Sequence, residues 1–108
     1  MNQRMTIERA REVLRDSADP AYAVLLEHVS LQIGYYQPRG RDPQEPHSRD
    51  EVYVVAAGTG FFVNGHSRQA FEPGEVLFVP AGQVHRFEDF SEDFAAWVVF
   101  YGPEGGEA

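Results

Sequence analysis

The sequence predicts an all-β fold, an antiparallel sandwich or barrel, with one short helix before it. Short runs of β-branched and aromatic residues follow one another from residue 21 onward, and turn signals separate them at regular intervals. A chain of 108 residues is long enough for one domain with a single hydrophobic core. We therefore expect an N-terminal helical segment at 1–20, a β-barrel at 21–101 and a flexible C-terminal tail at 102–108.

The helix is expected over residues 6–17. Thr6 is a residue type that caps the N-termini of helices, and Pro20 closes the segment. An apolar stripe at helical spacing would face the rest of the protein. This stripe consists of Ile7, Ala10, Val13 and Leu14.

Eight strand-like runs follow the helix. Asn64-Gly65 lies between two of them and is the strongest short hairpin signal in the chain. The last run, at 94–101, carries bulky apolar residues on both faces, which indicates that both faces are covered. One face would meet the barrel interior and the other a partner or the N-terminal segment, so we expect a homodimer. The runs are 22–26, 31–36, 51–57, 61–63, 67–71, 76–79, 84–87 and 94–101.

Composition narrows the classes of function. The formal net charge is −8, from 17 acidic and 9 basic residues, and a field of that sign repels nucleic acid and anionic membrane surfaces. The absence of cysteine excludes disulfides, thiolate metal sites and cysteine nucleophiles. No run approaches the ~20 apolar residues of a membrane helix, and none near the N-terminus resembles a signal peptide. We therefore expect a cytoplasmic protein that binds neither nucleic acid nor membrane.

Metal-binding side chains occur in two separate segments. Glu45, His47 and Glu51 share sequence parity, so an extended chain would point them to one side. His85 follows the turn at 80–82 and would have to meet them across the fold. Two carboxylates and two imidazoles suit a divalent transition metal that keeps open coordination positions. A single histidine is more often structural or exposed, so the hypothesis depends on convergence of the set.

The same segments resemble the two motifs of the cupin family. The spacing His47-x3-Glu51-x6-Gly58 is similar to the second half of the first cupin motif, G-x5-H-x-H-x3,4-E-x6-G. Residues 74–85, GEVLFVPAGQVH, are similar to the second motif, G-x5-P-x-G-x2-H-x3-N, up to its histidine. The resemblance implies a cupin-type β-barrel, or jelly roll, of two packed sheets with a metal held inside.

The chain departs from the cupin motifs at three positions. Gly40 stands one residue too close to Glu45, and Glu45 itself occupies a histidine position. Asp89 replaces the asparagine of the second motif, and Gln44 can also turn toward an ion. The resemblance implies one divalent transition metal (Mn, Fe, Zn or Ni), which two glutamates would neutralise. The positions that match the ligands of the family are Glu45, His47, Glu51 and His85.

The resemblance implies dioxygenase-, isomerase- or decarboxylase-type chemistry on a small metabolite. No nucleophile–base pair is recognisable, so an enzyme would depend on the metal itself. The alternative is a non-catalytic module that binds a sugar-like or aromatic metabolite, with Arg39, Arg41 and Glu45 as recognition groups. A partner-binding dimer without metal or ligand is a third interpretation. The candidates for the pocket wall are Tyr36, Gln44, Tyr53, Phe87 and Trp97.

Overall fold

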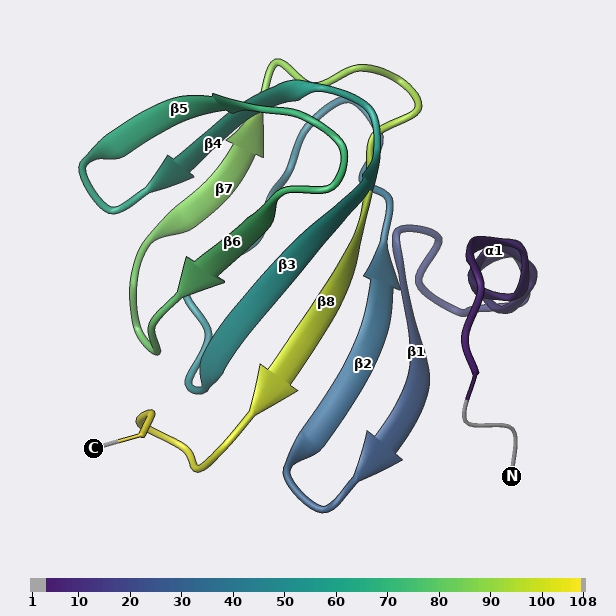
Figure 1. Cartoon of the computed structure of the whole chain (residues 1–108), viewed down its shortest axis with the longest axis horizontal. Helices are drawn as coiled ribbons and strands as arrows, with labels where there is room; N and C mark the ends of the chain where they lie inside the picture. Colours follow the sequence, from purple (N-terminus) through teal and green to yellow (C-terminus); the bar gives the residue numbers. More distant parts are fainter. Residues whose placement is uncertain (1–3, 108) are drawn as a thin grey trace.

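The computed structural model describes residues 4–107, which form one helix and eight strands (Figure 1). Every expected strand is present, and each begins and ends within two residues of its expected bounds, so the all-β expectation is confirmed. No helix in this described part of the chain is long and apolar enough to cross a membrane. The elements are α1 (Ile7–Arg15), β1 (Tyr22–His28), β2 (Leu31–Tyr36), β3 (Asp50–Ala57), β4 (Gly60–Asn64), β5 (Ser67–Phe71), β6 (Val76–Val79), β7 (His85–Glu88) and β8 (Ala95–Tyr101).

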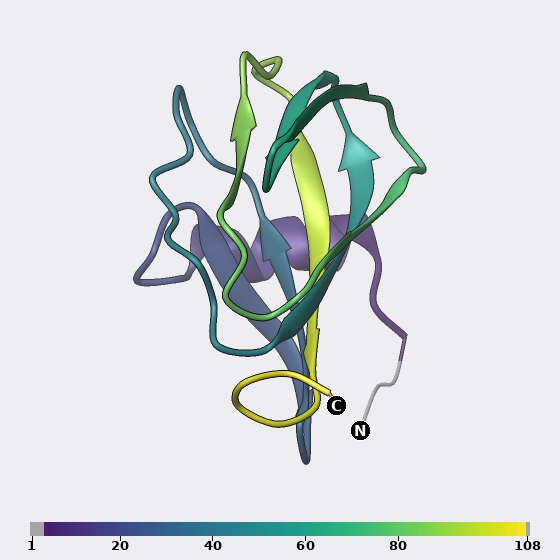
Figure 2. The ribbon, with the colours of Figure 1, turned by 90° about the vertical axis from the view of Figure 1, so that its left-hand side faces the viewer.

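The strands form two antiparallel sheets that pack together (Figure 2). The larger sheet has the order β1-β2-β8-β3-β6, and the smaller sheet has the order β5-β4-β7. Tyr53 of β3 lies opposite Val98 of β8 and Leu77 of β6. Residues directly opposite on paired strands share a face of the sheet. The side chains of these three residues therefore point toward the core between the sheets.

Aromatic side chains dominate this core. Phe87 is central, because its ring centroid lies 4.5 Å from that of Phe94, 4.8 Å from that of Phe62 and 4.9 Å from that of Tyr53. Each such pair contributes about 0.5–1.5 kcal/mol beyond the area it buries. The cluster fills the interior beside most of β3, and the polar part of the interior begins at Glu51, near the start of that strand.

Helix α1 packs against the outer face of the larger sheet beside β1 (Figure 1). Thr6 caps it, as expected, by accepting a hydrogen bond from a backbone N–H of the first turn at 3.1 Å. Ala10 and Leu14 are buried against Tyr35 of β2. The Tyr35 ring in turn meets Trp97 of β8 edge-on, with 5.2 Å between centroids. The N-terminal segment therefore covers part of the second apolar face of β8.

The C-terminal residues turn back onto the start of β3. Glu107 N–H donates to Asp50 Oδ2 at 2.9 Å, and Gly105 N–H donates to the Ser48 carbonyl at 2.6 Å. Asp50 Oδ1 accepts from Ala81 N–H at 2.9 Å. The hydrogen bonds from Glu107, the stronger cause, and from Ala81 hold the pKa of Asp50 below its ordinary value. The hydrogen bond from Ala81 also joins the turn before β7 to the start of β3. Glu51 lies near the start of β3 and His85 at the start of β7, so this bond ties together the two strand ends that carry candidate metal ligands.

Candidate metal centre

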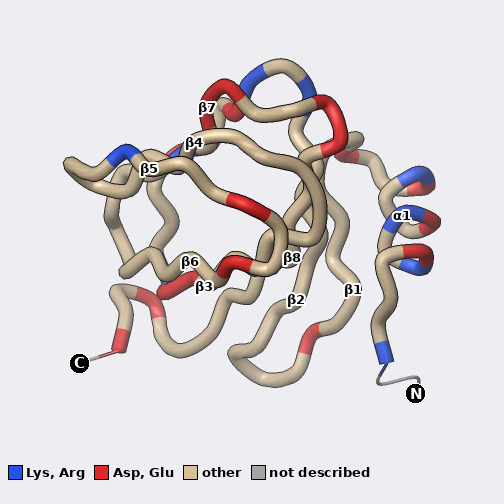
Figure 3. The backbone as a smooth tube through the Cα atoms, turned by 45° about the horizontal axis from the view of Figure 1, so that its top comes forward, with Lys and Arg blue, Asp and Glu red and all other residues tan. Residues whose placement is uncertain are grey.

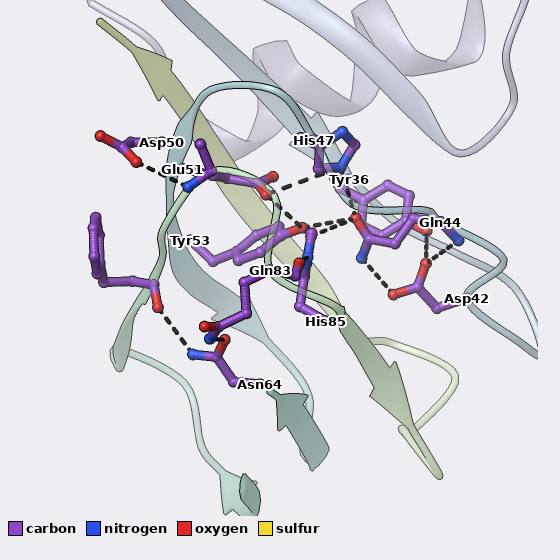
Figure 4. A network of polar contacts seen from close by, with 12 residues as sticks. Tyr36, Asp42, Gln44, His47, Asp50, Glu51, Tyr53, Asn64, Gln83 and His85 are labelled. Atoms are coloured by element: carbon purple, nitrogen blue, oxygen red, sulfur yellow. Dashed lines mark hydrogen bonds and ion pairs between the residues drawn. The ribbon is translucent and has the colours of Figure 1, made fainter. Parts of the chain in front are cut away.

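Three candidate metal ligands meet between the two sheets (Figure 4). Glu51 lies near the start of β3, His85 begins β7 on the opposite sheet, and His47 lies in the loop at 37–49. One ligand atom from each lies within 4.8 Å of the others. Glu51 Oε1 is 3.1 Å from His85 Nε2 and 3.9 Å from His47 Nε2. Glu51 and His85 are buried, whereas His47 is partly exposed.

Gln44 brings a fourth oxygen to the same place. Its Oε1 lies 3.1 Å from Nε2 of both His47 and His85, and it accepts a hydrogen bond from the Tyr53 hydroxyl at 2.9 Å. The oxygen and nitrogen of an amide are distinguished by their partners. Gln44 Nε2 donates to Asp42 Oδ2, and a carboxylate can only accept. The amide oxygen of Gln44 therefore faces the histidines.

Asp42 holds the loop and its glutamine in place. It is 8% exposed, and its Oδ2 accepts from Phe87 N–H at 2.9 Å. Its Oδ1 accepts from the Tyr36 hydroxyl at 2.5 Å and from Gln44 N–H at 3.2 Å. Both oxygens of this buried carboxylate are thus hydrogen-bonded, which offsets the cost of burying it. Asp42 fixes Gln44 relative to β7, which carries His85.

The tautomer of His85 follows from its neighbour Gln83. His85 Nδ1 lies 2.9 Å from the Gln83 carbonyl, which only accepts, so Nδ1 carries a proton. In a neutral ring, Nε2 then has a lone pair that faces lone pairs on Glu51 Oε1 and Gln44 Oε1. Among the buried side-chain atoms of residues 4–107, Glu51 Oε1 is one of two without a hydrogen-bond partner. A cation between these atoms, or a second proton on His85, removes the repulsion.

The two histidines respond to this setting in opposite directions. Burial lowers the pKa of His47 below its ordinary value of 6.5, and the negative charge of Glu51 offsets this only in part. Burial also acts to lower the pKa of His85, but its contacts with Glu51 and the Gln83 carbonyl outweigh burial and raise the pKa. The lowered pKa favours neutral His47 near pH 7, whereas the raised pKa favours protonation of His85.

A cavity of about 520 Å³ opens beside these residues, and Gln44, His47 and Glu51 line it. A small organic molecule fits a volume of this size. Two arginines, Arg39 and Arg41, also line the cavity. The wall is otherwise largely aromatic and apolar, formed by Tyr22, Tyr36, Tyr53, Val98 and Phe100.

Comparison with known families agrees with this geometry. The family described as "Cupin domain" matches residues 33–101, well over half of the chain. The chain belongs to the cupin family. All the candidate ligands of the cupin site lie within the matched residues.

Two known proteins are similar in sequence to this cupin domain. It is 37% identical over 95 residues to an uncharacterised protein of Streptomyces coelicolor, covering 86% of this chain and 90% of that protein. It is 32% identical over 75 residues to the dimethylsulfoniopropionate lyase DddQ of Ruegeria pomeroyi, covering 68% of this chain. The match covers only 35% of the length of the lyase, so this likeness concerns about a third of that protein.

Solved cupin structures share the fold at low sequence identity. A cupin-2 domain protein from Rhodospirillum rubrum matches with a TM-score of 0.64 and 18% identity, covering 77% of this chain and 60% of that chain. KdgF from Halomonas sp. matches with a TM-score of 0.67 and 14% identity, covering 82% of this chain and 84% of that chain. At these identities the likeness supports the cupin fold alone.

The cupin fold does not bring Glu45 to the cluster. Glu45 is exposed, and Gln44 lies beside the histidines where Glu45 was expected. The expectation carried strand alternation back from Glu51, but residues 37–49 form a loop in which alternation does not apply. Hydrogen bonds to Asp42 turn Gln44 inward instead.

Trp97 does not reach the cavity, so its assignment to the pocket wall needs correction. It lies opposite Val54 on the outer face of the larger sheet, where it packs near Tyr35. Both faces of β8 are apolar, so the sequence did not reveal which of its residues point inward. Phe87 lies deeper, in the aromatic core. The wall candidates that line the cavity are Tyr36, Gln44 and Tyr53.

Tyr22 and Asp42 contribute to the site but were not among the sequence candidates. A Cβ added at Gly34 would lie 2.4 Å from the Tyr22 hydroxyl, so Tyr22 lies directly over this glycine. A glycine inside a strand signals such a close approach, and this signal could have pointed to Tyr22. No pattern in the sequence pointed to Asp42 as part of the site, because its role depends on hydrogen bonds to residues far from it in the sequence.

The tyrosines of the cavity are neutral, and their hydroxyls donate hydrogen bonds to side chains of the protein. Burial, together with the charge of Glu51, raises the pKa of Tyr22 to about 12. Burial also raises the pKa values of Tyr36 and Tyr53 above the ordinary 10.0. The hydroxyl donors and their acceptors are Tyr22 to Gln32, Tyr36 to Asp42 and Tyr53 to Gln44.

Proposed function

We propose that this cupin domain holds one divalent transition metal and that a small organic molecule in the adjoining cavity completes its coordination. The proposed ligands are His47, Glu51 and His85, with Gln44 as the fourth donor. The buried Glu51 Oε1, which lacks a hydrogen-bond donor and faces other lone pairs, is the observation that carries the proposal. A cation at the centre would satisfy all four groups at once.

The donor set limits the metal and the chemistry. Two imidazole nitrogens, one carboxylate oxygen and one amide oxygen suit Mn, Fe, Ni or Zn. A metal bound there supplies Lewis acidity and orients a ligand that coordinates it. The protein's own part is to favour the neutral form of His47, to hold Gln44 through Asp42, and to surround the ligand with tyrosine rings. Dioxygenase- or isomerase-type chemistry would draw on the same metal.

Metal analysis of the untagged protein tests the proposal. We expect about one metal per chain in the wild type, and strong loss of metal in His47→Ala and His85→Ala, because each removes one of few donors. His66→Ala is the matched control, since His66 is exposed beside a hairpin turn and should leave the metal content unchanged. Fully stable protein without metal in every preparation would contradict the proposal and favour the non-catalytic binding module.

A lyase reaction is a second candidate, favoured by the 32% identity with the dimethylsulfoniopropionate lyase. The test is release of dimethyl sulfide when the metal-loaded protein is incubated with dimethylsulfoniopropionate. Activity in the wild type and in His66→Ala, but not in His85→Ala, would support it. No release from protein that holds its metal would exclude this substrate and leave the metal-binding proposal intact.

A further inference from the structure

We infer that the cavity takes a small carboxylate, bound through the metal and met by Arg39 and Arg41 at the cavity wall. The inference rests on the proposed metal site and adds the chemical class of its ligand. The charge of the donor set, the direction of the tyrosine hydrogen bonds and the position of the two arginines lead to it independently.

The four donors leave a divalent ion under-neutralised. Glu51 carries the only negative charge among them, because Gln44 and neutral His47 and His85 carry none. A divalent ion held by this set keeps one net positive charge. The two glutamates expected from the sequence would have cancelled it, but Glu45 is exposed and lies outside the cluster. A ligand with one negative oxygen donor restores the balance.

Hydrogen-bond donors in the cavity wall are few. The hydroxyls of Tyr22, Tyr36 and Tyr53 already donate to protein acceptors. Arg39 and Arg41 line the same cavity, and within residues 4–107 neither side chain takes part in an ion pair. Guanidinium groups bind carboxylates through paired charge-assisted hydrogen bonds. The wall is therefore equipped to hold an anion rather than a neutral polar ligand.

The arginines form a local exception in an acidic protein. The net charge is −8, and acidic residues occur on many elements of the chain (Figure 3). Arg39 also lines a neighbouring hollow with Arg11 and Arg15 of α1, so positive charge gathers on this side of the opening. Asp19 is the one acidic wall residue apart from Glu51, and its Oδ1 accepts a hydrogen bond from Ala21 N–H. This local field would attract an anion that the rest of the surface repels.

Most of the cavity wall is apolar or aromatic, which favours a ligand that carries an apolar group. Val98 and Phe100 of β8 line the cavity of about 520 Å³ together with the rings of Tyr36 and Tyr53. Contact of such a wall with a hydrocarbon group or an aromatic ring of the ligand favours binding. The ligand class is thus a carboxylate attached to a compact apolar group.

Matched pairs of carboxylates and amides test this class. Protein loaded with Co(II) is titrated with acetate, propionate and benzoate, and with acetamide, propionamide and benzamide, while its visible spectrum is followed. At least one carboxylate should bind about tenfold or more tightly than its amide, since a charge-assisted bond is about twice as strong as a neutral one. Arg39→Gln and Arg41→Gln should each weaken that binding about fivefold, as expected for partly solvated ion pairs.

Arg9→Gln is the charge-matched control, because Arg9 is exposed on α1 and pairs with Glu12 instead of lining the cavity. Amides that bind as tightly as their carboxylates would overturn the inference. So would an effect below twofold in the Arg39→Gln/Arg41→Gln double variant. The Co(II) content of each sample separates these failures from failure of the proposed function, since protein that takes up no metal at His47, Glu51 and His85 contradicts both.

Discussion

At the scale of single residues, the proposed metal site depends on a carboxylate that lies outside the donor set. Asp42 accepts hydrogen bonds from Phe87 N–H, from the Tyr36 hydroxyl and from both nitrogens of Gln44. It therefore decides which end of the Gln44 amide faces the histidines. Such partners of metal ligands commonly alter metal affinity by about 10–100-fold when they are removed.

Asp42→Asn should weaken metal binding by about 10–100-fold, because the new amide can donate to Gln44 Oε1 and favour the flipped orientation of that side chain. The measurement is a metal titration combined with the visible spectrum of the Co(II) form. Asp93→Asn is the control, at an exposed carboxylate that accepts a hydrogen bond from the nearby Ser91 hydroxyl. Lower thermal stability with an unchanged spectrum and affinity would show that Asp42 is merely structural.

Metal affinity should fall as the pH falls, in two steps. Metal binding needs neutral histidines, so protons compete for the ligands. The pKa of His85 is raised above 6.5, so its proton competes already above that pH. The pKa of His47 is lowered below 6.5, so a second proton competes only in more acidic solution.

Apparent affinity should therefore drop about tenfold per pH unit below the His85 pKa, and about a hundredfold per unit below the His47 pKa. Titrations against a chelator of known pH dependence measure this slope. In His66→Ala the profile should match the wild type. An affinity that stays constant on either side of pH 6.5 would rule out the two imidazoles as ligands.

At the scale of elements, strands were predictable and the loop was not. Alternation along each strand places Tyr53 on the same side as Glu51 in β3 and Phe87 on the same side as His85 in β7, and the structure buries all four residues. The loop at 37–49 has no such period, so its inward residue, Gln44, required knowledge of the Asp42 hydrogen bonds. The prediction that Trp97 lines the pocket was wrong for another reason. Both faces of β8 are apolar, and only the pairing of β8 with β3 defines which face is inner.

Gly58 lies in the turn between β3 and β4 and is the last residue of the first cupin motif. A glycine is required there for two physical reasons. Its φ is +86°, and an added Cβ would lie 2.5 Å from Phe94 Cα. Gly74 has a φ of +90°, but a Cβ added there would meet no atom within 4 Å, so this glycine offers a matched control.

Gly74→Ala should lower the free energy of unfolding by about 1–2 kcal/mol, the cost of a left-handed backbone. Gly58→Ala should lower it by a further ~1–3 kcal/mol, because the backbone of Phe94 must move. Urea unfolding of both variants measures the difference. Equal losses in the two variants would show that the turn relaxes without cost.

At the scale of the whole molecule, one face of the larger sheet is apolar and partly uncovered. Phe78 of β6 lies opposite Val52 of β3, which lies opposite Val99 of β8, so the three side chains share the outer face. Phe78 is 50% exposed and Val76 is 65% exposed. Two copies of a chain with a net charge of −8 repel each other, so they would associate best through a surface without charge. We therefore expect the homodimer to form through this face.

Phe78→Glu should dissociate that dimer, because it would place two like charges in a desolvated interface. Sedimentation at several concentrations measures the state of association. Val29→Glu is the control, since Val29 is 98% exposed in the β1–β2 turn and carries the same substitution away from this face. A wild type that sediments as a monomer at every concentration would refute the expectation.

The proposed metal position lies between the two layers of the molecule. His85 belongs to the smaller sheet and Glu51 to the larger, so an ion between them would add a link between the two sheets. Ni(II) or Mn(II) at about 100 times its dissociation constant should add about 2.7 kcal/mol of stability, or roughly 10 °C in Tm for a domain of this size. Thermal unfolding with the metal and with a chelator measures this shift. His85→Ala should lose the shift, whereas His28→Ala, at an exposed position at the end of β1, should keep it. An equal shift in His85→Ala would mean that the metal stabilises the protein from another site.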